Sequence, residues 1–259
     1  MITKDILRQI APTAKESIIS DLEKYFDKYI VQYEVNTYLR VCHFLAQCAH
    51  ESASFRTLEE YATGSAYEGR RDLGNTKTGD GKRYKGRGII QLTGRSNYRT
   101  YGLKLGLDLE GNPELAEQPE TSVRTALEYW KTNKLNAYAD KDDIGTITKR
   151  INGGFNGLED RKANLARAKK VLKGIIFTDK PTPAAPAAEP LNIVVAKKGD
   201  NSSYVNDLQK MLVGKGIKLD VDGDFGPQTE EGVKEFQRWS VLPATGQIDT
   251  RTLAELMKQ

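Results

Sequence analysis

Apolar residues in the first part of the chain recur every three or four positions, which is the period of one face of an α-helix. Four stretches have this spacing: residues 16–30, 37–50, 121–133 and 158–173. In the first stretch the apolar positions are Ile18, Ile19, Leu22, Tyr25, Phe26 and Tyr29. The pattern predicts a mainly helical region.

The stretch between the second and third of these helices, residues 63–97, has a different character. It is rich in Gly, Asp, Asn and Arg, and within it only residues 89–92, Ile-Ile-Gln-Leu, resemble a short strand. A loop-rich stretch of this length inside a helical domain usually lines a site. We therefore expect functional residues here.

Residues 181–190 read Pro-Thr-Pro-Ala-Ala-Pro-Ala-Ala-Glu-Pro. Proline lacks an amide donor and resists both helix and sheet, so this composition is typical of an extended, semi-rigid spacer. The sequence predicts two domains, residues 1–180 and 191–259, joined by a linker at 181–190.

The second predicted domain contains a degenerate internal repeat. Segments 223–229 and 246–252 each have a glycine, an apolar residue two positions later and a threonine six positions later. A short helical pattern follows each segment, and the threonines are suited to cap those helices. With a third helix expected near residues 203–214, the repeat predicts a small three-helix domain.

Composition excludes an integral membrane enzyme. Hydrophobic residues make up 38% of the 259 residues, and no apolar run approaches the roughly 20 residues of a membrane-spanning helix. Charges interrupt the first ten residues, so we expect no secretory signal. Cys42 and Cys48 are predicted to lie about 9 Å apart along one helix, too far for a disulfide. This cysteine usage suits synthesis in a reducing compartment.

The formal net charge of +4 is unevenly distributed. Residues 1–180 carry 30 Lys and Arg against 24 Asp and Glu, a net +6, whereas residues 191–259 carry 9 against 10, a net −1. Such a mild basic excess suits any polyanion, whether nucleic acid, an acidic membrane face or an anionic bacterial envelope. Charge alone does not choose among these partners.

Glu51 stands at the end of the second predicted helix. It shares a helix face with Phe44 and Cys48, so we expect apolar neighbours around its carboxyl. Such surroundings keep a carboxyl protonated, as a general acid requires. An ordinary solvated glutamate at a helix end is the alternative that this spacing leaves open.

Further carboxyl groups follow Glu51 within a short distance in the chain: Glu59, Glu60, Glu68 and Asp72. Inverting glycoside hydrolysis uses two carboxyl groups about 6.5 to 9.5 Å apart, one to protonate the leaving oxygen and one to activate water. A helix end followed by a short loop is able to hold such a pair. A solvated acidic turn is the alternative.

Two motifs resemble metal sites but depart from them. His50-Glu51 begins like a zinc-protease signature, but Ser54 stands where the second histidine is required. The chain has two histidines, so we expect His43 and His50 to be packed or hydrogen-bonded rather than metal ligands. Residues 220–231 resemble a calcium loop, but Phe225 occupies its obligatory glycine position.

The glycine-rich segment 79–98 departs from the dinucleotide fingerprint, because Gln91 replaces the third glycine. Its amides, Gln91 and Asn97, suit sugar hydroxyl and N-acetyl groups. A second polar glycine cluster, residues 151–157, has the composition of a helix stop and turn. Within it Asn152 is the candidate for function.

Together these segments resemble the ordered motifs of family 19 glycoside hydrolases, which include plant and bacterial chitinases and phage endolysins. The resemblance covers roughly residues 35 to 165, and residues 70–75 and 79–81 place it nearest the endolysin branch. The segments that carry it are His50-Glu51-Ser52, Glu59-Glu60, Gly86-Arg87-Gly88-Ile89-Ile90-Gln91-Leu92-Thr93-Gly94, Asn97-Tyr98 and Ile151-Asn152-Gly153-Gly154.

This resemblance implies a helix-rich, two-lobed, lysozyme-like fold and an inverting displacement that needs no metal or cofactor. It implies that Glu51 is the general acid and Glu60 the general base. The short spacing between them leaves Glu59 and Glu68 open as alternative bases. The implied substrate-binding residues are Gln91, Thr93, Asn97 and Asn152.

Residues 191–259 resemble the three-helix peptidoglycan-binding domain of many wall hydrolases, which favours peptidoglycan over chitin or nucleic acid as partner. We therefore expect a monomeric phage-type endolysin that cuts the β-1,4 linkage between N-acetylmuramic acid and N-acetylglucosamine, without membrane insertion. Synthesis in the host cytoplasm and action at the wall after release are further expectations. A chitinase, a lytic transglycosylase and a non-catalytic wall-binding protein are the alternatives.

Overall fold

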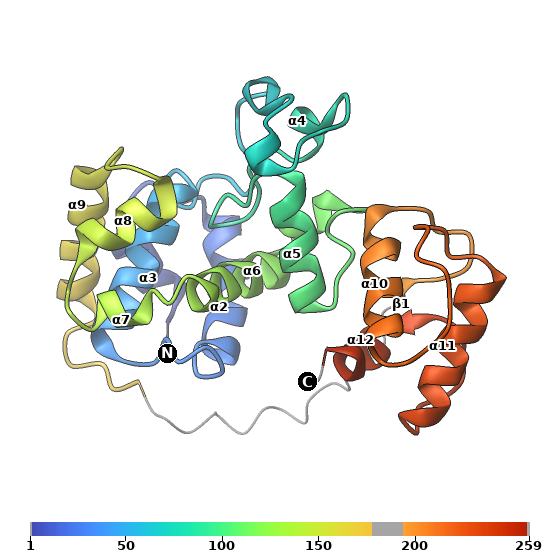
Figure 1. Ribbon diagram of the computed structural model, residues 1–259. Coiled ribbons are helices and arrows are strands. Elements are labelled where there is room, and N and C mark those ends of the chain that lie inside the picture. The colour runs from blue at the N-terminus through green and yellow to red at the C-terminus, as the bar shows by residue number, and fades with distance from the viewer. Residues whose placement is uncertain (1, 178–193, 258–259) are drawn as a thin grey trace. The chain divides into compact units, whose positions relative to one another are not determined.

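The computed structural model describes residues 2–177 and 194–257 (Figure 1). The chain forms two compact units, Met1–Tyr101 with Glu114–Ala184, and Gly102–Pro113 with Ala185–Gln259. The predicted linker at 181–190 lies outside the described residues. Within the described ranges, no helix is both long enough and apolar enough to cross a membrane.

The first unit is mainly helical, as predicted. The four expected helices are confirmed within two residues at each end. They are α2 (Glu16–Tyr29), α3 (Tyr38–Glu51), α6 (Pro119–Thr132) and α9 (Leu158–Val171). Shorter elements complete the unit: α1 (Lys4–Ile10), α4 (Asp80–Arg83), α5 (Arg95–Leu105, which continues into the second unit), α7 (Asn136–Ala139), α8 (Ile144–Asn152), and the 3₁₀ turns Ser65–Tyr67, Arg71–Leu73 and Pro113–Glu117.

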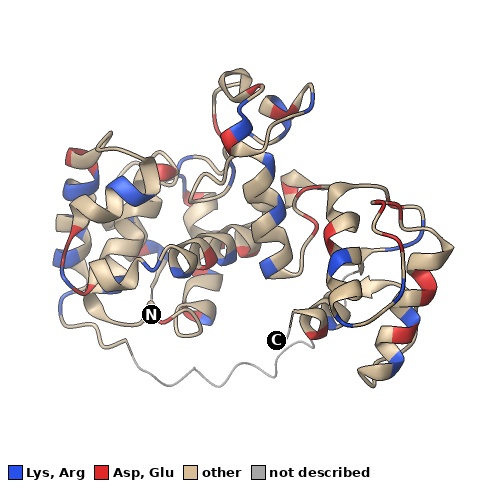
Figure 2. Cartoon of the chain, in the orientation of Figure 1, with Lys and Arg blue, Asp and Glu red and all other residues tan. Residues whose placement is uncertain are grey.

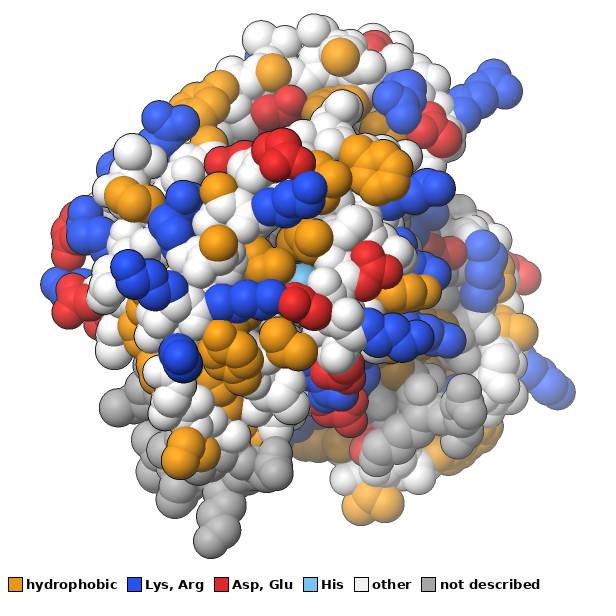
Figure 3. Space-filling model, turned by 90° about the vertical axis from the view of Figure 1, so that its left-hand side faces the viewer, with side chains coloured by type: hydrophobic (Ala, Val, Ile, Leu, Met, Phe, Trp, Pro, Cys, Tyr) orange, Lys and Arg blue, Asp and Glu red, His pale blue; other side chains and the backbone are white. Residues whose placement is uncertain are grey.

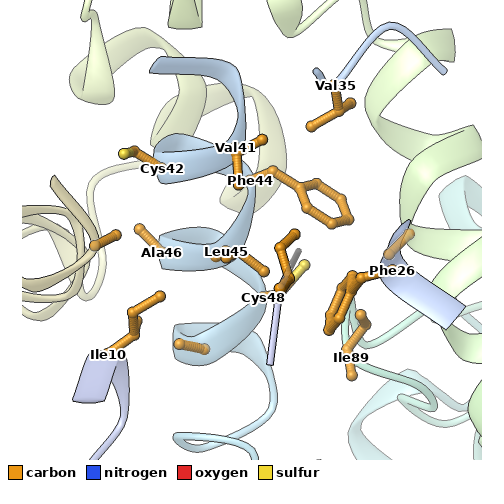
Figure 4. Close-up of a cluster of buried hydrophobic side chains, with 14 of the residues drawn as sticks. Ile10, Phe26, Val35, Val41, Cys42, Phe44, Leu45, Ala46, Cys48 and Ile89 are labelled. Carbon is orange, nitrogen blue, oxygen red and sulfur yellow. The ribbon is translucent and has the colours of Figure 1, made fainter. Parts of the chain in front are cut away.

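Helix α3 runs through the core of this unit, and its residues 41–49 are all buried. Phe44 meets Phe26 of α2 and Trp130 of α6 edge-on, with ring centroids 6.2 and 5.5 Å apart. Figure 4 shows Phe44 and Phe26 in the same buried layer, with Ile89 beside Phe26. The Thr37 side chain caps the first turn of α3, which fixes the start of the helix. The last residue of α3, Glu51, lies at the edge of the core.

The cysteines of α3 are Cys42 and Cys48, both buried, and neither forms a disulfide, as expected. Burial raises the pKa of the Cys42 thiol to about 12 and that of Cys48 well above its ordinary value. Both thiols therefore serve as small apolar groups that pack in the core.

The loop region around α4 contains bridges instead of the predicted strand. Arg87 pairs with Glu59 on one side and with Leu92 on the other. Residues 88–91 form a tight turn that joins Arg87 to Leu92, so the strand prediction for 89–92 was wrong. The apolar run exists because Ile89 and Ile90 are buried in the core of the unit, and burial alone does not distinguish a turn from a strand.

The second unit contains the three predicted helices, α10 (Ser203–Gly214), α11 (Pro227–Trp239) and α12 (Thr250–Leu256). Two short strands, β1 (Val194–Ala196) and β2 (Ile248–Asp249), add an antiparallel pair in which Val194 faces Asp249 and Ala196 faces Ile248. Its separate core includes Leu208, Leu212, Phe225, Val233, Ile248 and Leu253.

Two buried glutamines hold the repeat of this unit together. Gln209 of α10 accepts hydrogen bonds from the Asp222 and Gly223 amides at 3.1 and 2.8 Å, and its own amide donates to the Thr229 hydroxyl at 2.9 Å. Gln237 of α11 repeats the arrangement. It accepts from the Gly246 amide at 3.0 Å and donates to the Thr252 hydroxyl at 2.9 Å.

The predicted threonine caps were therefore wrong. The N-cap residue of α11 is Gly226, which has no capping side chain, and Asp249 caps α12 by accepting a hydrogen bond from the Thr252 amide. The threonines of the repeat instead accept hydrogen bonds from the two buried glutamines, because an amide group in the protein interior must find hydrogen-bond partners.

Figure 2 shows that positions occupied by Lys and Arg, and by Asp and Glu, are distributed along the ribbons of both units. On the face drawn in Figure 3, Lys and Arg side chains alternate with Asp and Glu. The basic excess of the first unit is thus mixed with acidic groups on that face.

Candidate active site

Glu51 is the last residue of α3, and its carboxyl faces Arg161 of α9. The Arg161 Nη2 atom lies 2.5 Å from Glu51 Oε1, and the second guanidinium nitrogen, Nη1, donates to Oε1 of Gln47 one turn earlier on α3. The Arg161 side chain is 1% exposed and the Glu51 side chain 17%. The prediction of apolar surroundings for the Glu51 carboxyl was therefore wrong, because a buried cation contacts this carboxyl and holds it at the protein surface.

A second pair joins the same two helices beside the first. His50 Nδ1 lies 2.6 Å from Asp160 Oδ2, which also accepts a hydrogen bond from Asn164 at 3.1 Å. Consecutive residues of α3 thus hold consecutive residues of α9. Gly157 packs against the imidazole so closely that a Cβ atom there would lie 2.2 Å from His50 Cε1. The expectation of a hydrogen-bonded His50 is confirmed.

Both carboxylate oxygens of Glu60 accept hydrogen bonds. The Tyr67 hydroxyl donates to Oε1 at 3.0 Å, and the Gly86 amide donates to Oε2 at 3.0 Å. Burial, together with the bond to Glu60, raises the Tyr67 pKa to about 12, so this hydroxyl remains a donor at neutral pH. The two donors fix the carboxylate in one orientation, as a base that positions water requires.

Gly86 explains why Glu60 and Gln91 lie together. A Cβ atom at this position would lie 2.7 Å from Gln91 Oε1 and 3.2 Å from Glu60 Oε2. Only glycine allows both side chains to approach the backbone here. The glycine-rich segment thus brings the backbone close to two predicted site residues.

The alternative bases have structural partners of their own. Glu59 is 47% exposed and forms an ion pair with Lys85 at 2.8 Å. Glu68 accepts hydrogen bonds from the Gly79 and Gly81 amides at 2.7 and 2.8 Å, which stabilises the start of α4. Among these three glutamates, Glu60 is the one whose carboxylate lies beside a predicted sugar-contacting residue.

The predicted residues Gln91, Thr93 and Asn97 form one hydrogen-bonded series. Gln91 has a left-handed backbone with φ +52°, and its side chain donates to the Gly88 carbonyl at 2.9 Å. Thr93 donates to the Gln91 carbonyl at 2.9 Å, and Asn97 donates to the Thr93 carbonyl at 2.7 Å. All three side chains are half-buried, so each keeps part of its surface accessible.

Asn152 is the last residue of α8 and is exposed. Gly153 follows the helix with φ +74°, and Gly157 precedes α9 with φ +71°, so the expected helix stop and turn is confirmed. This turn leads from Asn152 to the glycine that contacts His50. It connects the fourth predicted substrate-binding residue to the helix that carries Arg161.

Sequence reasoning missed Arg161, Gln47 and Tyr67. Arg161 lies in a helix rich in lysine and arginine, where nothing separates a buried arginine from solvated ones. Among the described residues, no group of three or more His, Cys, Asp or Glu side chains is placed to hold a metal ion. A cavity of about 410 Å³ lies in the loop region, lined by Gly69, Arg71, Asn75 and Thr76, and none of the predicted site residues lines it.

The helical fold and the comparisons with known proteins identify a glycoside hydrolase of lysozyme-like architecture. Residues 24–145 match the family described as class I chitinase, and residues 201–256 match the putative peptidoglycan binding domain. The chain is 36% identical over 167 residues to a glycosyl hydrolase family 19 domain-containing protein of Haemophilus influenzae, covering 52% of this chain and 78% of that protein. The chain belongs to glycoside hydrolase family 19.

Plant relatives match a smaller share of their own length. Acidic endochitinase SP2 of Beta vulgaris is 33% identical over 129 residues, which cover 48% of this chain and 44% of that protein. Among solved structures, chitinase C of Streptomyces griseus HUT6037 is similar with a TM-score of 0.54 at 22% identity, covering 70% of this chain and 79% of that chain. A bacterial family 19 chitinase is similar with a TM-score of 0.55 at 22% identity, covering 70% and 98%. These likenesses confirm the predicted fold.

Proposed function

We propose that this protein hydrolyses the β-1,4 linkage between N-acetylmuramic acid and N-acetylglucosamine in bacterial peptidoglycan. One observation carries the proposal: a family 19 glycosidase unit and a peptidoglycan-binding unit occur in a single chain. A domain that binds the polymer raises the local concentration of the enzyme on it. This favours the wall polymer over chitin as the substrate.

In the proposed reaction Glu51 donates its proton to the glycosidic oxygen as the bond to the anomeric carbon breaks. Glu60 accepts a proton from a water molecule that attacks the opposite face of that carbon. Water thus adds across the bond, and the anomeric configuration inverts. A hydrogen bond from the Arg161 guanidinium fixes the position of the Glu51 carboxyl, which reacts in its protonated form, and the donors Tyr67 and Gly86 fix the position of the base.

The remaining predicted residues serve the substrate. Gln91 and Asn97 present amides to the sugar, and Thr93 helps to hold the attacking water, because its hydroxyl belongs to the same hydrogen-bonded series. Asn152 contributes a further exposed amide from the end of α8. Neither step requires a metal or an organic cofactor.

The biological role that we propose is that of a phage-type endolysin acting as a monomer. The protein would be made in the cytoplasm of the host and would reach the wall after a separate protein opens the membrane. The resemblance of residues 70–75 and 79–81 to the endolysin branch supports this role. Chitin hydrolysis on the same scaffold is the second candidate, and it is supported by the plant relatives, which are chitinases.

Mass spectrometry of fragments released from defined peptidoglycan tests the proposal. We expect new reducing ends on N-acetylmuramic acid, with one oxygen from labelled water in each. Proton NMR of the fresh product should show the α-anomer first. Anhydro-sugar ends would instead identify a lytic transglycosylase. Reducing N-acetylglucosamine ends, or release from chitin but not from peptidoglycan, would also contradict the proposal.

A further inference from the structure

The end of α11 exposes two large apolar side chains two residues apart. Trp239, the last residue of the helix, is 56% exposed, and Val241 is 92% exposed. Neither side chain contributes its apolar surface fully to the core of the second unit. Exposed aromatic and aliphatic groups that lie together often mark a binding surface.

The backbone at Val241 is unusual for this type of residue. The Val241 amide donates to the Arg238 carbonyl at 3.2 Å and the Leu242 amide to the Gln237 carbonyl at 2.8 Å, which closes the helix in a Schellman motif. The motif requires a left-handed residue, and Val241 has φ +57°. Glycine is the usual residue at this position, and a β-branched side chain is disfavoured there.

The folded chain gains little from valine at this position, because the side chain is almost wholly exposed. Residues held in a disfavoured backbone conformation occur preferentially at functional sites. Strain and exposure thus coincide at one residue, two positions after an exposed tryptophan. Both observations indicate that these side chains serve a contact outside the folded chain.

The surroundings of Trp239 suit a neutral ligand. A Cβ atom on Gly216 would lie 4.0 Å from the indole, so the ring lies beside the turn that follows α10. The neighbouring cation, Arg238, forms an ion pair with Glu231 at 3.2 Å. A planar indole matches the apolar face of a pyranose ring, whereas the stem peptides of peptidoglycan carry charges.

We propose that Trp239 and Val241 form a glycan contact surface, with the indole stacked on an N-acetylated sugar of the peptidoglycan strand. This inference rests on the proposed attachment of the second unit to peptidoglycan. It assigns the contact to the glycan and to the end of α11. Binding to the stem peptides, or binding through another face of the second unit, would contradict the proposal.

Co-sedimentation with purified sacculi tests the proposal. The full chain carries Glu51→Gln in every case, so that the sacculi stay intact. In this background Trp239→Ala and Val241→Gly are each expected to raise the Kd about fivefold or more, as truncation of an anchoring side chain does. Val221→Ser is the matched control, because Val221 is another exposed apolar residue of the same unit, 38% exposed, and its removal should leave the Kd unchanged.

Val241→Gly separates binding from folding. Glycine adopts the left-handed conformation without strain, so this variant should melt at the same or a higher temperature while binding more weakly. An unchanged Kd for both Val241→Gly and Trp239→Ala would overturn the proposal. So would a Val221→Ser variant that loses as much affinity as they do.

Two further measurements distinguish the ligand and the unit. Sacculi stripped of stem peptides by an amidase should still bind, and loss of binding on stripping would overturn the assignment to the glycan. The double variant Gln209→Ala/Gln237→Ala removes both buried glutamines and loosens the second unit. If it loses binding while Trp239→Ala keeps it, the unit binds through another face and the glycan contact surface is wrong. If it binds as well as the parent, attachment through the second unit is wrong as well.

Discussion

Arg161 and Glu51 form an ion pair in which the cation is 1% exposed and the carboxyl 17% exposed. The guanidinium also bonds to Gln47, so its direction is set from inside the protein. The outer partner, Glu51, is the one that reaches the surface. This arrangement connects the packing of α3 against α9 to the position of the proposed acid.

We predict that Arg161→Lys lowers kcat by about 10²-fold with little change in KM, because lysine keeps the charge but replaces the two fixed guanidinium nitrogens that reach Gln47 and Glu51 by a single flexible ammonium group. Steady-state kinetics on a soluble glycan measures both constants. Lys162→Ala is the matched control, since Lys162 is 49% exposed and pairs with Glu159 on the same helix. Arg161→Lys activity above about half of the wild-type value would contradict the positioning role.

A comparison of three glutamine variants identifies the base. Glu60→Gln should lower the rate of hydrolysis by about 10² to 10⁴-fold, as removal of a general base does. Glu59→Gln should have little effect, because the Glu59 carboxyl is 47% exposed and its ion pair with Lys85 is therefore largely screened by water. Glu68→Gln should mainly lower the melting temperature and have a smaller effect on the rate of hydrolysis, since it weakens the hydrogen bonds at the start of α4. A larger loss of rate in Glu59→Gln than in Glu60→Gln would reverse the assignment.

Stability at acid pH should depend on His43. This side chain is fully buried, its Nε2 lies 2.7 Å from Asp142 Oδ1, and its Nδ1 has no hydrogen-bond partner in the described structure. Burial lowers the His43 pKa, against the raising effect of Asp142 and Asp143 and with the lowering effect of Lys169. A protonated imidazole would bury a second N–H group without an acceptor.

The unfolded chain therefore binds a proton at His43 more readily than the folded one. The contribution of His43 to stability is fully present above its ordinary pKa of about 6.5 and is lost as pH falls from there through the lowered folded value. Melting temperatures between pH 7.5 and 5 should fall more steeply for the wild type than for His43→Gln. Parallel curves for the two proteins would contradict this explanation.

Periodicity predicted α2, α6 and α9 because each of them buries one face, whereas α3 was found although its residues 41–49 are buried on all sides. It failed at residues 89–92, where apolar side chains fill the core from a turn. It also could not find Arg161, because a buried guanidinium and a solvated one have the same sequence pattern. Such a side chain is recognised only when the helix that faces it is known.

In the candidate site, too, the sequence predicted some of the residues and not others. The order of the motifs predicted Glu51, Glu60, Gln91 and Asn97, and the structure places Glu60 beside Gln91 across Gly86. The partners of the carboxyl groups, Arg161 and Tyr67, come from segments without a comparable motif. Their selection depends on how α9 and the loop region pack, which the local sequence does not encode.

The direct test of the two-carboxyl account is the Glu51→Gln variant on purified sacculi. The release of soluble fragments and the fraction of protein bound are measured in the same samples. We predict that release falls by about 10²-fold or more while the bound fraction is unchanged, because the amide keeps its size but cannot donate an acidic proton. Release at more than about a tenth of the wild-type rate would show that Glu51 is not the general acid.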